Sequence, residues 1–284
     1  MLLNPLEFHK PATLQAAVKL YSELPDARLL AGGTFLLNSL KTMKRRGNKT
    51  PSHVISLKHI PDLHGIAVKD EKLFIGSAVV INDLFASSLL TDNFALLRIV
   101  CRNISTNPIR NMATVGGNLT SRYTWTELGA ALIALKADMH FVGPDLKEEV
   151  LSVEDFFANN ARTNKILRAI SIIKDKKIKS SYQRVKKLSD VDVPLLAVCV
   201  TAQFSGNHFK DTRVVINSGT AFAKRDLVLE KFLNESSAHK NLAQEALDHL
   251  DTPIYDTRSD DYKKAMFRVG IKNAINELIS GREK

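Results

Sequence analysis

The stretch RNMATVGGNLTSRYTWTELG, residues 110–129, holds two adjacent glycines behind a β-branched run, then an asparagine, hydroxyl side chains, the only tryptophan and an acid. A similar glycine pair lies upstream in RLLAGGTFLLNSL, residues 28–40. Glycine lacks a Cβ, so it reaches positive φ and lets a ligand approach the backbone closely. Successive amides of such a turn can form a concavity that binds phosphate oxygens, and a helix that begins next strengthens it. Both pairs are therefore candidate anion-binding turns.

In the first turn we expect Gly32 and Gly33 to supply the concavity and Thr34 to add a hydroxyl donor. The amides of Phe35 and Leu36 are expected to point into the same space, because the predicted helix begins there.

In the second turn we expect Gly116 and Gly117 to play the same part, with Asn118 fixing the turn through its side chain. Neither turn has the spacing of a Walker A loop or of GxGxxG. A single Gly-Gly pair after a strand is more often ordinary turn chemistry. Two such turns in one chain favour a diphosphate clamped from both sides, and so a dinucleotide held outside the Rossmann pattern.

The rest of the chain shows a mixed pattern of helices and strands. Apolar spacing predicts a helix over 12–24, with Thr13 as its cap. Alternation around a polar KDEK tip predicts a hairpin over 65–80. Residues 139–157 are expected to form a strand, a Gly-Pro turn and a second strand. From about residue 175 the pattern changes to long antiparallel strands followed by helices, so we expect an α+β fold with a boundary near 170–178.

The composition excludes several classes of protein. The chain has 284 residues, of which 44% are hydrophobic and 25% charged, as in a soluble globular protein. No apolar run approaches the roughly 18 to 20 residues of a membrane helix, and no secretory signal is apparent, so we expect a cytoplasmic protein and no membrane partner. Cys101 and Cys199 lie in apolar settings and are expected to be buried thiols. No cluster has zinc or iron–sulfur spacing, so no metal site is expected on this chain.

The net charge of +10 comes partly from basic clusters at 41–49, 174–179 and 184–187. Aromatic residues do not interleave with these charges as in a base-stacking platform, and no helix-turn-helix or RNP-like motif is visible. We therefore expect no nucleic-acid partner. Solvated faces, an anionic ligand or an acidic partner subunit account for the charge as well.

The two glycine motifs also carry a family resemblance. LLAGGTFLLNSLK and IRNMATVGGNL, with LFIGSAVVINDL between them, resemble the flavin-binding subunit of the molybdenum hydroxylases, the medium subunit of the xanthine and carbon monoxide dehydrogenases. The likeness extends through ISLKHIPDLHGI and, more loosely, SYQRVKKLSDVDVPLLAV. It implies an FAD-binding domain of the PCMH/vanillyl-alcohol-oxidase type at 1–172, with subdomains at about 1–57 and 58–172, and a C-terminal α+β domain at 173–284.

The resemblance implies an FAD pyrophosphate between the two glycine turns. It assigns cofactor contacts to Leu30, Ala31, Gly32, Gly33, Thr34, Phe35, Leu36, Ile104, Thr114, Val115, Gly116, Gly117, Asn118, Thr124, Glu127, Leu167 and Arg184.

Three of these implied contacts have particular roles. Glu127 stands where the family usually has an aspartate near the flavin, and Leu167 matches an apolar position near the isoalloxazine. Arg184 falls where relatives often carry lysine, and a cation there would stabilise reduced, anionic flavin; the other interpretation is a surface strand residue. Tyr123 or Trp125, in the unusual SRYTWT segment, either packs on the ring system or fills core.

The function that the resemblance implies is electron transfer. Electrons from a molybdopterin subunit would pass through iron–sulfur clusters of a second subunit to FAD on this chain, and then to an acceptor such as NAD. No residue of this chain is assigned a catalytic acid–base or nucleophile role. Two alternatives stay open: a flavoenzyme like UDP-N-acetylenolpyruvoylglucosamine reductase, and a basic binding module that has lost FAD.

Overall fold

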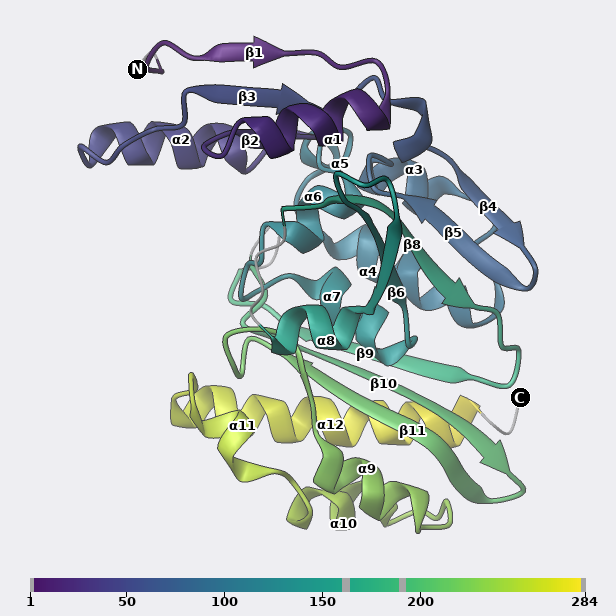
Figure 1. Ribbon diagram of the computed structural model, residues 1–284. Helices are drawn as coiled ribbons and strands as arrows, with labels where there is room; N and C mark the ends of the chain where they lie inside the picture. Colours follow the sequence, from purple (N-terminus) through teal and green to yellow (C-terminus); the bar gives the residue numbers. More distant parts are fainter. Residues whose placement is uncertain (1–2, 160–163, 189–192, 282–284) are drawn as a thin grey trace.

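The computed structural model describes residues 3–159, 164–188 and 193–281, and Figure 1 shows the described chain as three sheets with helices between and around them. The first sheet has three strands, the second five and the third four. The sheets follow one another along the sequence, so each is built mostly from one continuous stretch of chain. The α+β expectation is thereby confirmed, while the exact division into domains stays a prediction.

The first sheet is parallel, in the order β1-β3-β2. Its strands are β1 (Glu7–His9), β2 (Arg28–Leu30) and β3 (His53–Ser56), and its crossover helices are α1 (Leu14–Glu23) and α2 (Leu36–Arg45). Thr13 caps α1 as predicted, since its hydroxyl accepts a hydrogen bond from the Ala16 amide at 3.1 Å. The parallel order leaves the turn after β2 at the end of the sheet that faces the middle of the molecule (Figure 1).

The second sheet is antiparallel, in the order β4-β5-β8-β6-β7. Its strands are β4 (Ile66–Lys69), β5 (Lys72–Gly76), β6 (Asp138–Val142), β7 (Glu148–Ser152) and β8 (Ile166–Ile173). Strands β4 and β5 form the predicted hairpin, with Asp70 and Glu71 at positive φ in its tip.

The helices of this middle part are η1 (Pro61–Leu63), α3 (Ile81–Ala86), η2 (Asp92–Phe94), α4 (Ala95–Asn103), α5 (Asn107–Arg110), α6 (Val115–Thr120), α7 (Glu127–Ala134) and α8 (Val153–Ala158). Helices α3, η2, α4, α6, α7 and α8 bury apolar side chains in the core that they share with the second sheet, whereas Leu63 of η1 belongs to the core of the first sheet and α5 has no buried residue. The strand expected up to residue 157 ends earlier, because the Ser152 hydroxyl accepts from the Asp155 amide at 2.9 Å and starts α8.

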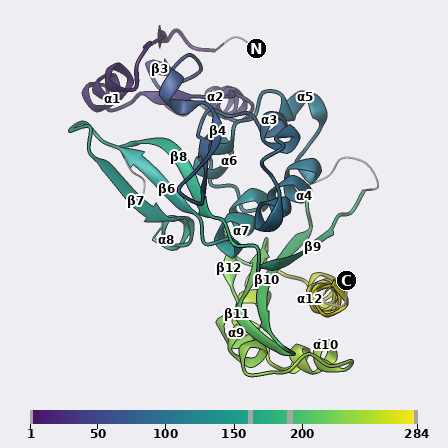
Figure 2. The same ribbon diagram turned by 90° about the vertical axis from the view of Figure 1, so that its right-hand side faces the viewer.

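The third sheet is antiparallel, in the order β12-β11-β10-β9. Its strands are β9 (Lys179–Val185), β10 (Leu196–Ser205), β11 (His208–Asn217) and β12 (Lys224–Arg225). The C-terminal helices are α9 (Leu227–Asn234), α10 (Leu242–Glu245), η3 (Ala246–Asp248), α11 (Thr252–Asp256) and α12 (Asp261–Gly281). Figures 1 and 2 show α9 and α12 on the side of this sheet that faces away from α7.

The third sheet is buried on both faces. Val198 and Val200 of β10 pack with the C-terminal helices, while Cys199 of the same strand belongs to the core of the middle part. Both cysteines, Cys101 and Cys199, are buried free thiols, as predicted. Within the described residues, no helix is both long and apolar enough to cross a membrane.

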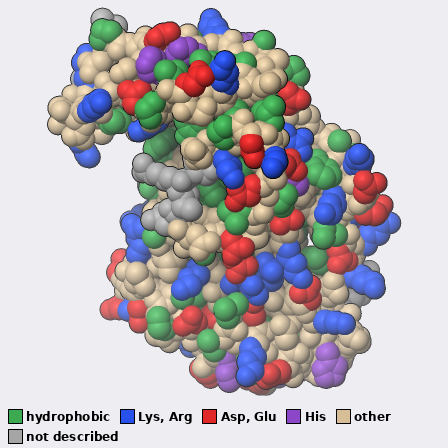
Figure 3. Space-filling model, in the orientation of Figure 1, with side chains coloured by type: hydrophobic (Ala, Val, Ile, Leu, Met, Phe, Trp, Pro, Cys, Tyr) green, Lys and Arg blue, Asp and Glu red, His purple; other side chains and the backbone are tan. Residues whose placement is uncertain are grey.

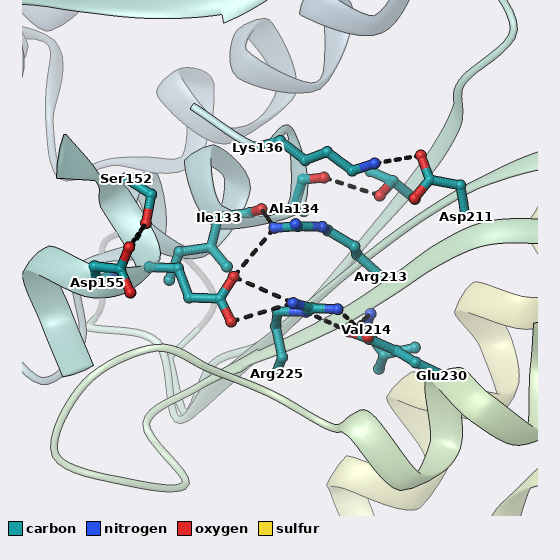
Figure 4. Close-up of polar contacts among 12 residues, drawn as sticks. Ile133, Ala134, Lys136, Ser152, Asp155, Asp211, Arg213, Val214, Arg225 and Glu230 are labelled. Atoms are coloured by element: carbon teal, nitrogen blue, oxygen red, sulfur yellow. Dashed lines mark hydrogen bonds and ion pairs between the residues drawn. The ribbon is translucent and has the colours of Figure 1, made fainter. Parts of the chain in front are cut away.

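Polar contacts reinforce this junction between the middle part and the third sheet (Figure 4). Arg213 of β11 donates to the Ile133 carbonyl of α7 at 2.9 Å and to Glu154 of α8 at 3.3 Å. Arg225 of β12 donates to both carboxylate oxygens of Glu154, each at 3.2 Å. The last residues of α7 and the first of α8 are therefore fixed by side chains of the C-terminal sheet.

Candidate functional site

The first glycine turn leaves β2 and enters α2 with its amides unpaired. Among the residues that the structure describes, none accepts a hydrogen bond from the backbone amides of residues 32–36. Gly33 has a φ of +73°, a conformation that favours glycine, and it turns the chain into the helix. Five successive free amides at the start of a ten-residue helix are the arrangement expected for binding an anion.

Gly32 is required by the close approach of the two motifs. An ideal Cβ at this position would lie 1.9 Å from the carbonyl oxygen of Met112 and 3.0 Å from the Cα of Ala113. A Cβ at Gly117 would in turn lie 4.0 Å from the Cβ of Ala31. The two motifs are therefore in direct contact, as the clamp hypothesis requires.

The second motif differs from the expectation in its local structure. Gly116 and Gly117 lie inside α6, and their amides are already used: Gly116 donates to the Ser77 carbonyl at 2.8 Å and Gly117 to the Thr114 hydroxyl at 3.1 Å. The prediction of a second open concavity is wrong. The Thr114 hydroxyl caps the helix at Gly117, and the Gly116 amide is already bonded to the Ser77 carbonyl between β5 and α3. The site therefore has free amides on one side only, at residues 32–36, and the second motif closes the other side by packing against Gly32.

Asn118 does not fix the turn through its side chain, contrary to the prediction. Its Oδ1 is buried and has no hydrogen-bond partner among the described residues. A buried acceptor without a donor costs free energy, so this oxygen is available to accept a hydrogen bond from a group bound beside it.

An aromatic row lies beside the first turn. The rings of Phe35 and Tyr123 meet edge to face with centroids 4.3 Å apart, and Tyr123 stacks on Trp125 with centroids 4.5 Å apart. Trp125 is 41% exposed, so it does not fill core. Phe35 and Tyr123 also line a groove of about 390 Å³ along α2, together with Asn38, Ser39, Thr42, Met43, Arg46 and Asn48. The row offers flat aromatic surface next to the free amides, and the groove beside it is lined mainly by polar side chains.

Glu127 and Arg184 form a buried ion pair. Glu127 is the first residue of α7, and its Oε1 accepts from Arg184 Nε at 2.7 Å and from the Tyr182 hydroxyl. The two side chains are only 4% and 9% exposed. Burial raises the pKa of Glu127, although the bonds from Tyr182 and Arg184 oppose that rise. Burial, and secondly the Glu127 charge, hold the pKa of Tyr182 well above its usual value.

This pairing changes the interpretation of both residues. The sequence suggested each of them separately as a neighbour of the flavin, but the structure places them against each other across the junction of α7 and β9. Tyr182 was not predicted. Its signal is the i,i+2 spacing with Arg184, which puts the two on one face of a strand.

The other residues implied by the resemblance lie around these features. Leu30 precedes the first turn, and a Cβ at Gly33 would meet its side chain at 3.2 Å. Ile104 follows α4 and its carbonyl accepts from Arg110 at 3.0 Å. The carbonyl of Thr124 accepts from the Ser218 hydroxyl at 3.4 Å, while Leu167 is buried in β8.

Arg122 was also not predicted, and it anchors the SRYTWT segment. Its guanidinium lies over the rings of Phe156 and Phe222, at 4.9 and 4.6 Å from their centroids. The residue has a φ of +54°, so the chain turns sharply there before Tyr123. The unusual segment is thus held at its start by cation–π contacts and presents its aromatic row at its end.

Comparison with known proteins identifies the family. Residues 4–175 match the family described as the FAD binding domain in molybdopterin dehydrogenase. The chain is 28% identical to the carbon monoxide dehydrogenase medium chain of Hydrogenophaga pseudoflava, over 95% of this chain and 96% of that one. It is 30% identical to the xanthine dehydrogenase FAD-binding subunit of Escherichia coli O157:H7, over 48% and 46% of the two chains.

Solved structures agree in fold. The carbon monoxide dehydrogenase of H. pseudoflava that lacks the Mo-pyranopterin moiety of its cofactor matches with a TM-score of 0.87 and 27% identity, over 97% of this chain and 98% of that one. The quinoline 2-oxidoreductase of Pseudomonas putida 86 has the same TM-score at 19% identity, over 99% of both chains, and shows the fold alone.

These matches confirm the resemblance stated from the glycine motifs, and with it the oxidoreductase class and FAD as the cofactor. The free amides of the first turn and the unsatisfied oxygen of Asn118 fit a group with phosphates and hydroxyls. The chain belongs to the family of FAD-binding domains of molybdopterin dehydrogenases.

Proposed function

We propose that this chain is the electron-transfer flavoprotein subunit of a multi-subunit molybdenum hydroxylase, and that it passes electrons from the iron–sulfur clusters of a partner subunit through FAD to an acceptor such as NAD. The observation that carries the proposal is the run of free amides at 32–36, closed on one side by the second glycine motif. Bound there, FAD supplies the redox chemistry, and the chain supplies binding, orientation and electrostatics.

The first turn is proposed to hold the pyrophosphate. The free amides and the N-terminal dipole of α2 favour negative charge, and the hydroxyl of Thr34 adds a donor. Gly116 and Gly117 act differently: the missing side chain of Gly116 lets α6 approach Ser77, and that of Gly117 leaves room for the Thr114 hydroxyl that caps the helix.

The second motif is proposed to contribute the acceptor that the first lacks. Asn118 Oδ1 would accept a hydrogen bond from a hydroxyl of FAD, which removes the cost of its burial. Thr114 and Val115 support it from the start of α6, where the Val115 amide donates to the Val79 carbonyl at 2.9 Å. Binding of FAD should therefore tighten this segment.

The flavin ring is proposed to lie between the aromatic row (Phe35, Tyr123 and Trp125) and the core that the second sheet shares with its helices. There it would be within reach of Ile104, Thr124 and Leu167. The Glu127–Arg184 pair would stand beside it as a nearly neutral unit, because the carboxylate compensates the guanidinium at 2.7 Å. The chain would then control the flavin potential through the balance of this pair rather than through a lone cation.

The partners proposed are the iron–sulfur and molybdopterin subunits of the same complex, and the compartment is the cytoplasm. The H. pseudoflava relative is a medium chain by name, and likeness to it extends over 95% of this chain. The net charge of +10 suits contact with an acidic subunit. We also propose that the domain division at 172/173 holds, with the FAD-binding part first.

The test has two stages. Chain purified alone, and then incubated with FAD, should show the visible absorbance bands of oxidised flavin; a colourless chain that takes up no FAD would favour the flavin-free binding module. Reduced complex should then be mixed with NAD or a quinone, and the flavin bands should return with the true acceptor. If neither NAD nor a quinone reoxidises the flavin, the acceptor assignment is refuted. Reduction of UDP-N-acetylenolpyruvoylglucosamine by the chain with NADPH would instead favour the alternative of a reductase acting on that nucleotide.

A further inference from the structure

A cluster of two histidines and one carboxylate lies on the first sheet, away from the glycine motifs. β1 pairs with β3 in parallel, with Glu7 opposite His53, and His9 two residues further along the same face of β1. Figure 3 shows histidine side chains gathered with acidic ones on the surface over β1 and β3. The histidine side chains are 15% and 24% exposed, so they are held in place while the carboxylate faces solvent.

The separations in this cluster are those of ligands around one ion. His9 Nε2 lies 3.2 Å from His53 Nδ1, while Glu7 Oε1 is 3.7 Å from His9 Nε2 and Glu7 Oε2 is 3.5 Å from His53 Nδ1. Zinc–nitrogen bonds of about 2.0–2.1 Å in a tetrahedron put neighbouring ligand atoms about 3.4 Å apart. The separation of the two imidazole nitrogens is about 0.2 Å below that value, and each nitrogen has one oxygen of Glu7 within about 0.3 Å of it, so the carboxylate would reach a shared ion through both of its oxygens.

Hydrogen bonds alone satisfy this arrangement poorly. One proton between the two imidazole nitrogens makes a single bond, and the distances of 3.5 and 3.7 Å to Glu7 exceed ordinary N–H···O bonds. Protonating both nitrogens would point two N–H groups at each other across 3.2 Å. A cation removes the conflict, because both neutral imidazoles and the carboxylate then act as electron-pair donors.

We propose that Glu7, His9 and His53 bind a divalent transition-metal ion, with Zn²⁺ as the preferred one and water in the fourth position. Imidazole and carboxylate ligands suit zinc, whereas magnesium prefers oxygen ligands alone. The ion would fasten β1, an edge strand of three residues, to the middle of the sheet.

This site is separate from the flavin site. His53 begins β3, whereas the first glycine turn follows Leu30, which pairs with Ser56 at the far end of the same strand. Three residues of strand span about 10 Å, so an ion held by His53 would not touch the anion-binding amides. Zinc is expected to change the stability of the chain and leave its flavin content unchanged.

The experiment is a calorimetric titration of Zn²⁺ into the full chain, loaded with FAD and stripped of metals by a chelator. We expect one ion to bind, His9→Ala and His53→Ala to weaken binding by about a hundredfold or more, and Glu7→Gln to weaken it less. Mg²⁺ should give no signal. The matched control is His239→Ala, because His239 pairs with a single carboxylate among the described residues, Glu245 at 3.3 Å, and that variant should bind zinc like the wild type.

A second readout is the thermal midpoint, which zinc should raise for the wild type and the His239→Ala variant but not for His53→Ala. The flavin spectrum reports whether each variant is folded, and Glu7→Gln, at an exposed carboxylate, serves if a histidine variant fails to fold. The proposal is overturned if no stoichiometric zinc binding occurs, or if the His9 and His53 variants bind zinc as tightly as the wild type.

Discussion

Gly32→Ala is the sharpest test of how the two glycine motifs work together. The added Cβ would sit 1.9 Å from the Met112 carbonyl oxygen, and real Cβ atoms keep at least about 3.0 Å from such atoms. The atoms in conflict are backbone on both sides, so no side chain can rotate away. The first turn and the Met112–Ala113 segment must therefore separate by about 1.1 Å.

That movement displaces the free amides relative to the wall that faces them. Losing one hydrogen bond to a charged phosphate group costs about 1.5–3 kcal/mol, which weakens FAD binding by about 10- to 150-fold. The overpacking itself should lower the free energy of unfolding by about 1–3 kcal/mol. Both effects follow from one contact, so they should appear together.

The assay is a titration of the deflavinated chain with FAD, followed by flavin fluorescence, with circular dichroism as the check of folding. The control is Gly206→Ala: Gly206 has a φ of +58°, which Gly32 does not share, and nothing lies within 4 Å of its ideal Cβ. It should lose about 1–2 kcal/mol of stability and no FAD affinity. A folded Gly32→Ala variant that binds FAD within threefold of the wild type would refute the reasoning.

Three further changes test other parts of the site and fold. Asn118→Ala removes an acceptor that is unsatisfied without FAD, so the apoprotein should keep its unfolding free energy while FAD affinity falls about fivefold in the same titration; equal FAD affinity would contradict a ligand role. Glu127→Gln removes the carboxylate of a buried ion pair, and breaking such a pair costs about 3–5 kcal/mol, so urea unfolding should show a loss of that size; an unchanged midpoint would argue against the pair. Burial raises the pKa of Glu148, but the hydrogen bonds from His140 and Arg168 outweigh burial and hold that pKa below the usual 4.5. The ionised Glu148 therefore contributes its full share to the free energy of unfolding above pH 4.5. This contribution is lost as the pH falls through the lower pKa of the folded state. Glu148→Gln should flatten the acid limb of the stability curve, and parallel acid limbs would exclude this carboxylate as the cause.

The sequence predicted the parts of the fold that depend on local pattern. The cap at Thr13, the hairpin around Asp70 and the burial of Cys101 follow from neighbouring residues alone, and the structure confirms them. The sequence did not predict the start of α8. Ser152 continues the apolar and polar alternation of a strand, and only the structure shows that its hydroxyl accepts a hydrogen bond from the Asp155 amide and so caps a helix.

The site was predicted less completely, because its contacts join distant parts of the chain. Nothing near Gly116 in the sequence shows that the Ser77 carbonyl takes its amide. Glu127 and Arg184 are 57 residues apart, so the sequence gives each charge without its partner. The motif therefore predicts that the turns meet, whereas the long-range packing decides which of their amides stay free.

The end of α7 has a consequence for how the protein is made. Its last carbonyls are satisfied by side chains of the C-terminal sheet: Thr201 donates to Ala134 at 3.0 Å and Arg213 donates to Ile133. Thr201 leaves the ribosome 67 residues after Ala134, which at about 5–20 residues per second is a delay of about 3–13 s. During that interval an almost wholly apolar helix lacks these side-chain donors and the sheet that covers it, so the nascent chain should be a client for holding chaperones until β10 and β11 emerge.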